Sequence, residues 1–154
     1  MVKTVAKQSQ KANSEEANKT VARVLHVDDD EDFLVISRRL LERRGSFRVE
    51  FALSVKQALQ KIKQNSYDVV VSDYQMFGRS GLDFLGELRA DGNDVPFFLV
   101  TGDCRDEIAM EALNLGVTQC FSKNKDFNLL FVELAFAIKE AVNAKRMINA
   151  GSEK

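Results

Sequence analysis

The sequence predicts an α/β fold, an open and doubly wound sheet of five parallel strands with helices on both faces. Short apolar runs alternate with segments of helical periodicity from Arg23 onward, which is the alternation typical of such sheets. Runs such as 69–71 and 97–100 lack polar alternation, as expected of strands that helices cover on both sides. With 154 residues the chain is long enough for one domain with its own core.

Local signals in the sequence support several of these elements. Ser54 and Asp126 each precede a helical segment and are suitable N-caps. His26 lies within an apolar strand run, so we expect a core histidine rather than a phosphate donor. The strands are expected at 23–27, 47–52, 68–72, 96–100 and 117–121, and the helices at 32–44, 54–65, 81–90, 105–115 and 126–147.

Composition limits the classes of partner and compartment. A net charge of -1 creates no long-range field that would attract nucleic acid or an anionic membrane, so we expect neither as a direct partner. Cys104 and Cys120 are too few for a disulfide framework and predict reduced thiols in a cytoplasmic protein. Polar composition predicts a flexible N-terminal tail at 1–22, followed by the domain at 23–148 and a C-terminal tail at 149–154.

Polar residues follow four of the predicted strands, at the edge where ligands bind in open α/β sheets. Taken singly, each has an ordinary structural explanation: an acidic run favours the N-terminus of a helix, and a lone Asp often makes a turn. One mechanism requires them all together, which favours a functional site. The residues are Asp28, Asp29, Asp30, Asp73, Thr101, Gly102 and Lys123.

That mechanism is the transfer of a phosphoryl group to a carboxylate with the help of a metal ion. Magnesium prefers oxygen ligands, which Asp28, Asp29 and Asp73 can supply. Asp73 would attack phosphorus and form an acyl phosphate. Lys123 would neutralise the phosphoryl oxygens, while Thr101 or a backbone N–H donates a hydrogen bond. No general base is required, because the nucleophile is already a carboxylate.

Residues 23 to about 145 resemble the receiver domain of two-component response regulators. The motifs that carry the resemblance are VLHVDDDEDF, DVVVSDYQM, FFLVTG and CFSKN, in that order along the chain. The resemblance implies a flavodoxin-like sheet with the strand order 2-1-3-4-5. It also implies a signalling module that is not an enzyme, apart from its own phosphorylation and dephosphorylation.

The resemblance further assigns roles to residues. It implies a histidine kinase or a histidine phosphotransfer protein as the donor, an unknown downstream protein as the target, and Mg²⁺ or Mn²⁺ as the cofactor. Asp30 would be a spectator. The implied roles are metal binding for Asp28, Asp29, Asp73 and the backbone carbonyl of Gln75, phosphoryl acceptance for Asp73, and contact with the phosphoryl group or switching for Thr101, Gly102 and Lys123.

The chain departs from the family pattern at three positions. Phe77 and Asn124 replace prolines that usually follow the Met of the acceptor loop and the site lysine. A Lys–Pro bond there is typically cis, so either the peptide before Asn124 is cis or the loop is rebuilt. Cys120 replaces an aromatic switch residue, and Phe121 is expected to be buried instead. A small side chain at Cys120 predicts weaker coupling between phosphorylation and the surface change.

Two other functional classes fit part of the pattern. A phosphatase of the haloacid dehalogenase kind also uses a strand-end Asp, and Asp28 with Asp30 imitates its signature, but Asp32 stands where that signature has Thr or Val. A receiver-like interaction module that works without phosphate would tolerate Asn124 and Cys120. Phosphorylation with acetyl phosphate and magnesium discriminates among these classes. We expect the output to come from a partner protein, a phosphotransfer domain or a larger chain.

Overall fold

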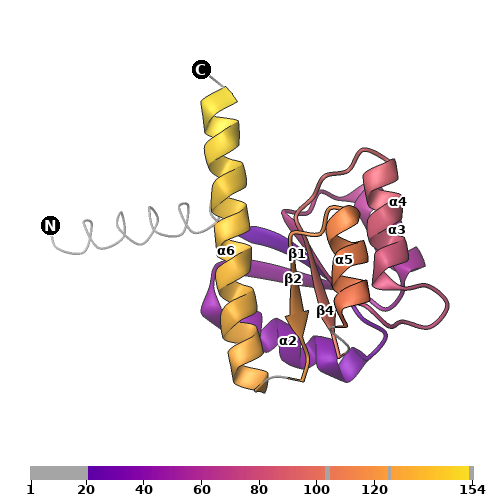
Figure 1. Cartoon of the computed structure of the whole chain (residues 1–154). Helices are drawn as coiled ribbons and strands as arrows, with labels where there is room; N and C mark the ends of the chain where they lie inside the picture. The colour runs from indigo at the N-terminus through magenta and orange to yellow at the C-terminus, as the bar shows by residue number, and fades with distance from the viewer. Residues whose placement is uncertain (1–20, 103–104, 125, 153–154) are drawn as a thin grey trace, which may run out of the picture.

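The structure, a computed structural model, describes residues 21–102, 105–124 and 126–152 and contains a five-stranded parallel sheet (Figure 1). The strand order β2-β1-β3-β4-β5 confirms the predicted architecture and order. The strands are β1 (Ala22–Val27), β2 (Phe47–Ala52), β3 (Val69–Asp73), β4 (Phe97–Thr101) and β5 (Gln119–Ser122). The helices are α2 (Glu31–Arg44), α3 (Val55–Gln64), α4 (Gly81–Ala90), α5 (Asp106–Asn114) and α6 (Phe127–Ser152).

Two hydrophobic cores lie on the two faces of the sheet. Val24 and Val71 belong to the core that α2 and α6 cover, whereas their neighbours Leu25 and Val70 belong to the core that α3, α4 and α5 cover. Both faces are buried, so consecutive strand residues are all apolar although their side chains alternate in direction. This explains the unbroken hydrophobic runs of the sequence.

Four of the described helices begin with a side-chain N-cap, and at α4 Ser80 and Asp83 form a capping box. Ser54 accepts a hydrogen bond from the backbone N–H of Gln57, and Asp126 accepts from two N–H groups in the first turn of α6, which confirms both predicted N-caps. Asp30, predicted to be a spectator, caps α2 by accepting from the N–H of Phe33 at 3.2 Å. The third residue of the acidic run therefore stabilises the N-terminus of α2.

The first strand and the last helix differ from the prediction at their outer ends. Residues 1–20 of the predicted tail lie outside the described residues, and Ala22 belongs to β1, where it pairs with Phe47. The last helix was predicted to end at 147 but continues to Ser152, so the predicted C-terminal tail is helical up to that residue. No proline interrupts residues 148–152, so the helix can continue past the predicted end.

Two buried side chains match their predictions. His26 is 1% exposed, with its Nδ1 2.8 Å from the hydroxyl of Ser37. Burial, together with the charge of Lys123, lowers the pKa of His26 to about 3, so this core histidine is neutral. Phe121 is buried against Phe98 on the α2–α6 face.

Among the described residues, no helix is both long and apolar enough to cross a membrane. Cys104 lies outside the described residues.

Candidate functional site

Three carboxylates meet where β1 and β3 end. Val27 of β1 pairs with Ser72 of β3, so Asp28 and Asp73 follow at the same level on neighbouring strands. One carboxylate oxygen from each of Asp28, Asp29 and Asp73 lies within 4.8 Å of the others. Asp28 and Asp73 are 1% and 7% exposed, whereas Asp29 faces solvent. The structure thus brings together the three acids that the sequence predicted to be neighbours.

Lys123, at the end of β5, completes the charged cluster. Its Nζ lies 2.9 Å from Oδ2 of Asp28 and 3.3 Å from Oδ1 of Asp73. The backbone N–H of Lys123 donates to the carbonyl of Thr101 at 2.9 Å, which holds the β5 end against β4. One ammonium therefore bridges two buried carboxylates.

Burial and like charges dominate the electrostatics of this cluster. Burial, reinforced by the charge of Asp28 and opposed by Lys123, raises the pKa of Asp73 to about 6. Burial also raises the pKa of Asp28. For Lys123, burial lowers the pKa, but its hydrogen bonds and ion pairs with the two acids outweigh this and raise the pKa above its usual value. At neutral pH the lysine is an ammonium.

The donor set fits a divalent cation with a preference for oxygen. Three carboxylates within reach of one another are hard ligands of the kind that Mg²⁺ takes. Beside them lies a hollow of about 480 Å³. It is lined by Asp29, Tyr74, Gln75, Met76, Phe77 and Ser80. The acidic pocket is thus compatible with a divalent metal, while the backbone carbonyl of Gln75 as a ligand stays a prediction.

Thr101 and Gly102 lie at the same edge of the sheet, at the end of β4. Thr101 is buried and pairs with Ser122 of β5, and β4 is the neighbour of β3, which ends in Asp73. The carbonyl of Gly102 accepts a hydrogen bond of 2.6 Å from the side-chain amide of Asn124. Their contact with a phosphoryl group stays a prediction.

The two residues that replace family prolines make hydrogen bonds in which they act as donors. The backbone N–H of Phe77 donates to Oδ2 of Asp29 at 3.2 Å, a bond that a proline lacks the hydrogen to form. Its side chain is 97% exposed beside the site. Asn124 donates from its backbone to Ser122 and from its side chain to Gly102, and the peptide bond before Asn124 is trans. The loop is therefore rebuilt around Asn124.

Sequence reasoning missed one contact at the site. The ring of Phe33, in the first turn of α2, lies under the ammonium of Lys123 with 4.5 Å between Nζ and the ring centroid. The signal in the sequence was an aromatic residue five positions after Asp28. The half-buried Cys120 packs on the opposite face, toward α5, so this position does not face the Phe33 ring.

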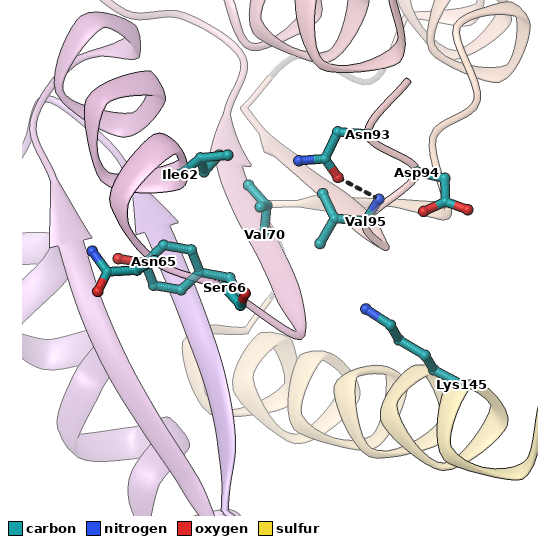
Figure 2. Close-up of a pocket in the computed structure, with 9 residues that line it drawn as sticks. Ile62, Asn65, Ser66, Val70, Asn93, Asp94, Val95 and Lys145 are labelled. Atoms are coloured by element: carbon teal, nitrogen blue, oxygen red, sulfur yellow. Dashed lines mark hydrogen bonds between the residues drawn. The ribbon is translucent and has the colours of Figure 1, made fainter. Parts of the chain in front are cut away.

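A second hollow, of about 240 Å³, lies at the other end of the strands (Figure 2). Asn93 accepts a hydrogen bond from the N–H of Val95 at its rim, and Lys145 points into it from α6. The acids of the candidate site do not contribute to it. Its lining is Ile62, Asn65, Ser66, Tyr67, Val70, Asn93, Asp94, Val95 and Lys145.

Relatives of this chain occur among curated proteins. The transcriptional regulatory protein ZraR of Escherichia coli (strain K12) is 32% identical over 124 residues, which cover 79% of this chain and 28% of ZraR. YvrH of Bacillus subtilis (strain 168), also a transcriptional regulatory protein, is 30% identical over 118 residues, which cover 77% of this chain and 48% of YvrH. The chain therefore spans between about a quarter and a half of the length of these relatives.

Solved structures and a family model agree with this. A response regulator receiver domain protein from Clostridium thermocellum superposes with a TM-score of 0.73 at 29% identity, covering 82% of this chain and 98% of that one. A CheY-like receiver domain protein from Methanospirillum hungatei JF-1 has a TM-score of 0.74 at 24% identity, over 83% and 98% of the two chains, and supports the fold. The response regulator receiver domain model matches residues 24–135. The chain belongs to the response regulator receiver domain family.

Proposed function

We propose that this domain accepts a phosphoryl group on Asp73 and signals through the change that follows. The observation that carries the proposal is the convergence of Asp28, Asp29 and Asp73 with the ammonium of Lys123 at one edge of the sheet. Four charged side chains, three of them at strand ends, make an unfavourable arrangement for stability, and phosphoryl transfer is a chemistry that uses all of them.

In the proposed reaction, a carboxylate oxygen of Asp73 attacks the phosphorus of a phosphohistidine. The new O–P bond gives an acyl phosphate, the P–N bond breaks, and its electron pair stays with the imidazole, which then takes a proton. A pKa of about 6 leaves Asp73 mostly ionised at neutral pH and therefore nucleophilic. Lys123, held 3.3 Å from Asp73, would pair with a phosphoryl oxygen, and Thr101 would donate from its hydroxyl.

Asp28, Asp29 and the backbone carbonyl of Gln75 would hold a magnesium or manganese ion together with Asp73. When bound, such an ion neutralises charge on the transferred group. Asp28 has a second role in the resting site, because it forms the shorter ion pair with Lys123. The fold holds these side chains before any donor arrives, so little reorganisation opposes the reaction.

The proposed donor is a histidine kinase or a histidine phosphotransfer protein, and the proposed target is another protein. With the chain at a net charge of -1, the domain itself has no surplus of basic side chains for nucleic acid. ZraR and YvrH are transcriptional regulators, so a role of the whole protein at DNA would belong to parts of it other than this domain. Its only catalysis would be its own phosphorylation and dephosphorylation.

Incubation with acetyl phosphate and magnesium, followed by intact mass measurement, tests the proposal. The wild type should gain the mass of one phosphoryl group, and Asp73→Asn should gain none because an amide is a poor nucleophile. Asp68→Asn is the matched control, because Asp68 precedes the same strand at its opposite end and bonds the N–H of Arg23. A label that survives in Asp73→Asn, or a wild type that takes no label, refutes the assignment. The second result would favour an interaction module that works without phosphate.

Thermal melting tests the metal site separately. Millimolar magnesium should raise the melting temperature at neutral pH by a few degrees, roughly the effect of 1–2 kcal/mol of binding. Asp29→Asn should reduce this rise, whereas Glu50→Gln, which removes the carboxylate that pairs with Arg23, should keep it. A wild-type melting temperature that magnesium leaves unchanged contradicts a metal site here.

A further inference from the structure

The ammonium of Lys123 has a neighbour that carries no charge. Two of its sides face the carboxylates of Asp28 and Asp73, at 2.9 and 3.3 Å. A third faces the ring of Phe33, with 4.5 Å between Nζ and the ring centroid. A cation over the face of an aromatic ring is attracted by the ring quadrupole, and more strongly where water is excluded. Lys123 is only half-buried, so a contact on this side adds to the two ion pairs in keeping its ammonium in the site.

The Phe33 ring is itself held by the start of α6. Its centroid lies 6.1 Å from that of Phe127 and 6.0 Å from that of Phe131, and those two rings are 5.1 Å apart. Phe131 is fully buried and Phe127 is the first residue of α6. The ring of Phe33 also lies edge-on to the ring of His26, with 5.8 Å between the centroids. We call Phe33, Phe127 and Phe131 the aromatic cluster.

We infer that Phe33 is a positioning residue for Lys123 and that the aromatic cluster links the site lysine to the first turn of α6. A lysine has a flexible stem and a strongly hydrated head, so without the ring its ammonium would be held by the two ion pairs alone and would turn toward water more often. With the ring, the ammonium stays beside Asp73, where it would meet a phosphoryl oxygen. This last step rests on the function proposed above.

The link to α6 gives the site a second connection to the surface. Pairing of Lys123 with a phosphoryl group would draw its ammonium away from Asp28 and change its contact with Phe33. The ring packs edge-on against Phe127, so the change reaches the start of α6 directly. This connection does not require an aromatic residue at Cys120, where the family usually has one.

The lysine–ring contact can be tested by NMR without any phosphate analogue. Protons on Cε of Lys123 should be shifted upfield by the Phe33 ring in the wild type and in Phe33→Tyr, and should lose that shift in Phe33→Leu. Phe51→Leu is the matched control, because it removes a ring that stacks under Arg38 at 3.9 Å. Lys123 protons at ordinary shifts in the wild type overturn the inference, even if Phe33→Leu does not fold.

Titration with beryllofluoride and magnesium tests the consequence for the site. Phe33→Leu should bind roughly 3- to 10-fold more weakly than the wild type, as expected for the loss of one cation–π contact. Phe33→Tyr should stay within about twofold of the wild type, and Phe51→Leu should match it. The amide shifts of Phe127 and Asn128 on binding should shrink in Phe33→Leu.

The outcomes separate this inference from the proposed function. Equal weakening in Phe33→Leu and Phe51→Leu would point to general loss of packing and overturn the positioning role. Wild-type affinity and wild-type α6 shifts in Phe33→Leu would also overturn it. A wild type that binds no beryllofluoride would instead refute phosphoryl acceptance, and the Lys123 proton shifts would then decide on the ring contact alone.

Discussion

The two ends of the sheet each hold a cluster of charged side chains, and the clusters are built differently. At the amino end of the strands, Arg23 pairs with Glu50 at 3.1 Å and lies 5.0 Å over the ring of Tyr67. At the carboxyl end, the ammonium of Lys123 pairs with the buried carboxylates of Asp28 and Asp73. The carboxylate of Asp29 lies close to both acids. The first cluster balances its charges one to one, and the second has an excess of negative charge.

The pKa shifts express this difference. Burial raises the pKa of Glu50, but the hydrogen bond from Tyr67 and the charge of Arg23 outweigh it and lower the pKa overall. Burial raises the pKa of Asp73 to about 6, and there the nearby acid adds to the effect. A balanced cluster stabilises the fold, whereas an unbalanced one stores repulsion that a ligand can relieve. The comparison therefore distinguishes a structural ion pair from a candidate site.

The largest expected effect on stability comes from Gly81, which lies against the backbone of Asp73. A Cβ on Gly81 would lie closer than 3.0 Å to the carbonyl oxygen of Asp73 and to Leu99. Gly81→Ala should therefore destabilise the domain by about 3 kcal/mol in urea denaturation. Gly86→Ala lies in the same helix with its nearest neighbour, Leu115, 3.8 Å away, and should be neutral or stabilising by up to about 1 kcal/mol. Equal stability of the two variants would show that the site is not crowded.

Removal of the shared ammonium should have the next largest effect. Lys123→Met leaves Asp28 and Asp73 without their cation, and at pH 7 we expect a loss of about 2–3 kcal/mol without unfolding. Much of this loss should disappear near pH 5, because Asp73, whose pKa burial raises to about 6, then takes up a proton. A loss that does not depend on pH would mean that Lys123 acts by packing rather than by charge.

The pH dependence of Asp73→Asn tests the stored repulsion. The folded-state pKa of Asp73, about 6, lies above the unfolded value. The contribution of this carboxyl to the stability of the wild type is therefore fully present below about pH 4 and is lost as the pH rises through 6. After allowance for solvent screening, the wild type should lose on the order of 1.5 kcal/mol relative to Asp73→Asn between pH 4 and 7. Parallel stability curves for the two proteins would contradict an elevated pKa.

The smallest effect should come from the amino end. Arg23→Met should cost about 1 kcal/mol at neutral pH, because the pair with Glu50 is one-third exposed and the stacking on Tyr67 is modest. The pKa of Glu50 is lowered in the fold, so the contribution of the pair is present above its unfolded pKa and is lost as the pH falls through the folded one. A cost at pH 7 as large as that of Lys123→Met would remove the distinction between the two ends.

The sequence by itself determined the sheet and the membership of the acidic cluster. Unbroken apolar runs mark strands buried on both faces, and the carboxyl ends of parallel strands must share one edge. Asp28, Asp73 and Lys123 could therefore be placed together although 95 positions separate the first from the last. The predicted roles of these residues in phosphoryl transfer still require the experiments described above.

Only the tertiary structure decided which atoms meet at that edge. Asp28 pairs with Lys123 while Asp30, two residues later, caps α2. Phe33 lies under the lysine, and α6 continues to Ser152 where the polar composition had predicted a tail. Periodicity assigns a residue to a face or an edge. Its contacts depend also on the direction of its side chain and on the packing of neighbouring elements, and both are determined only once the helices pack against the sheet.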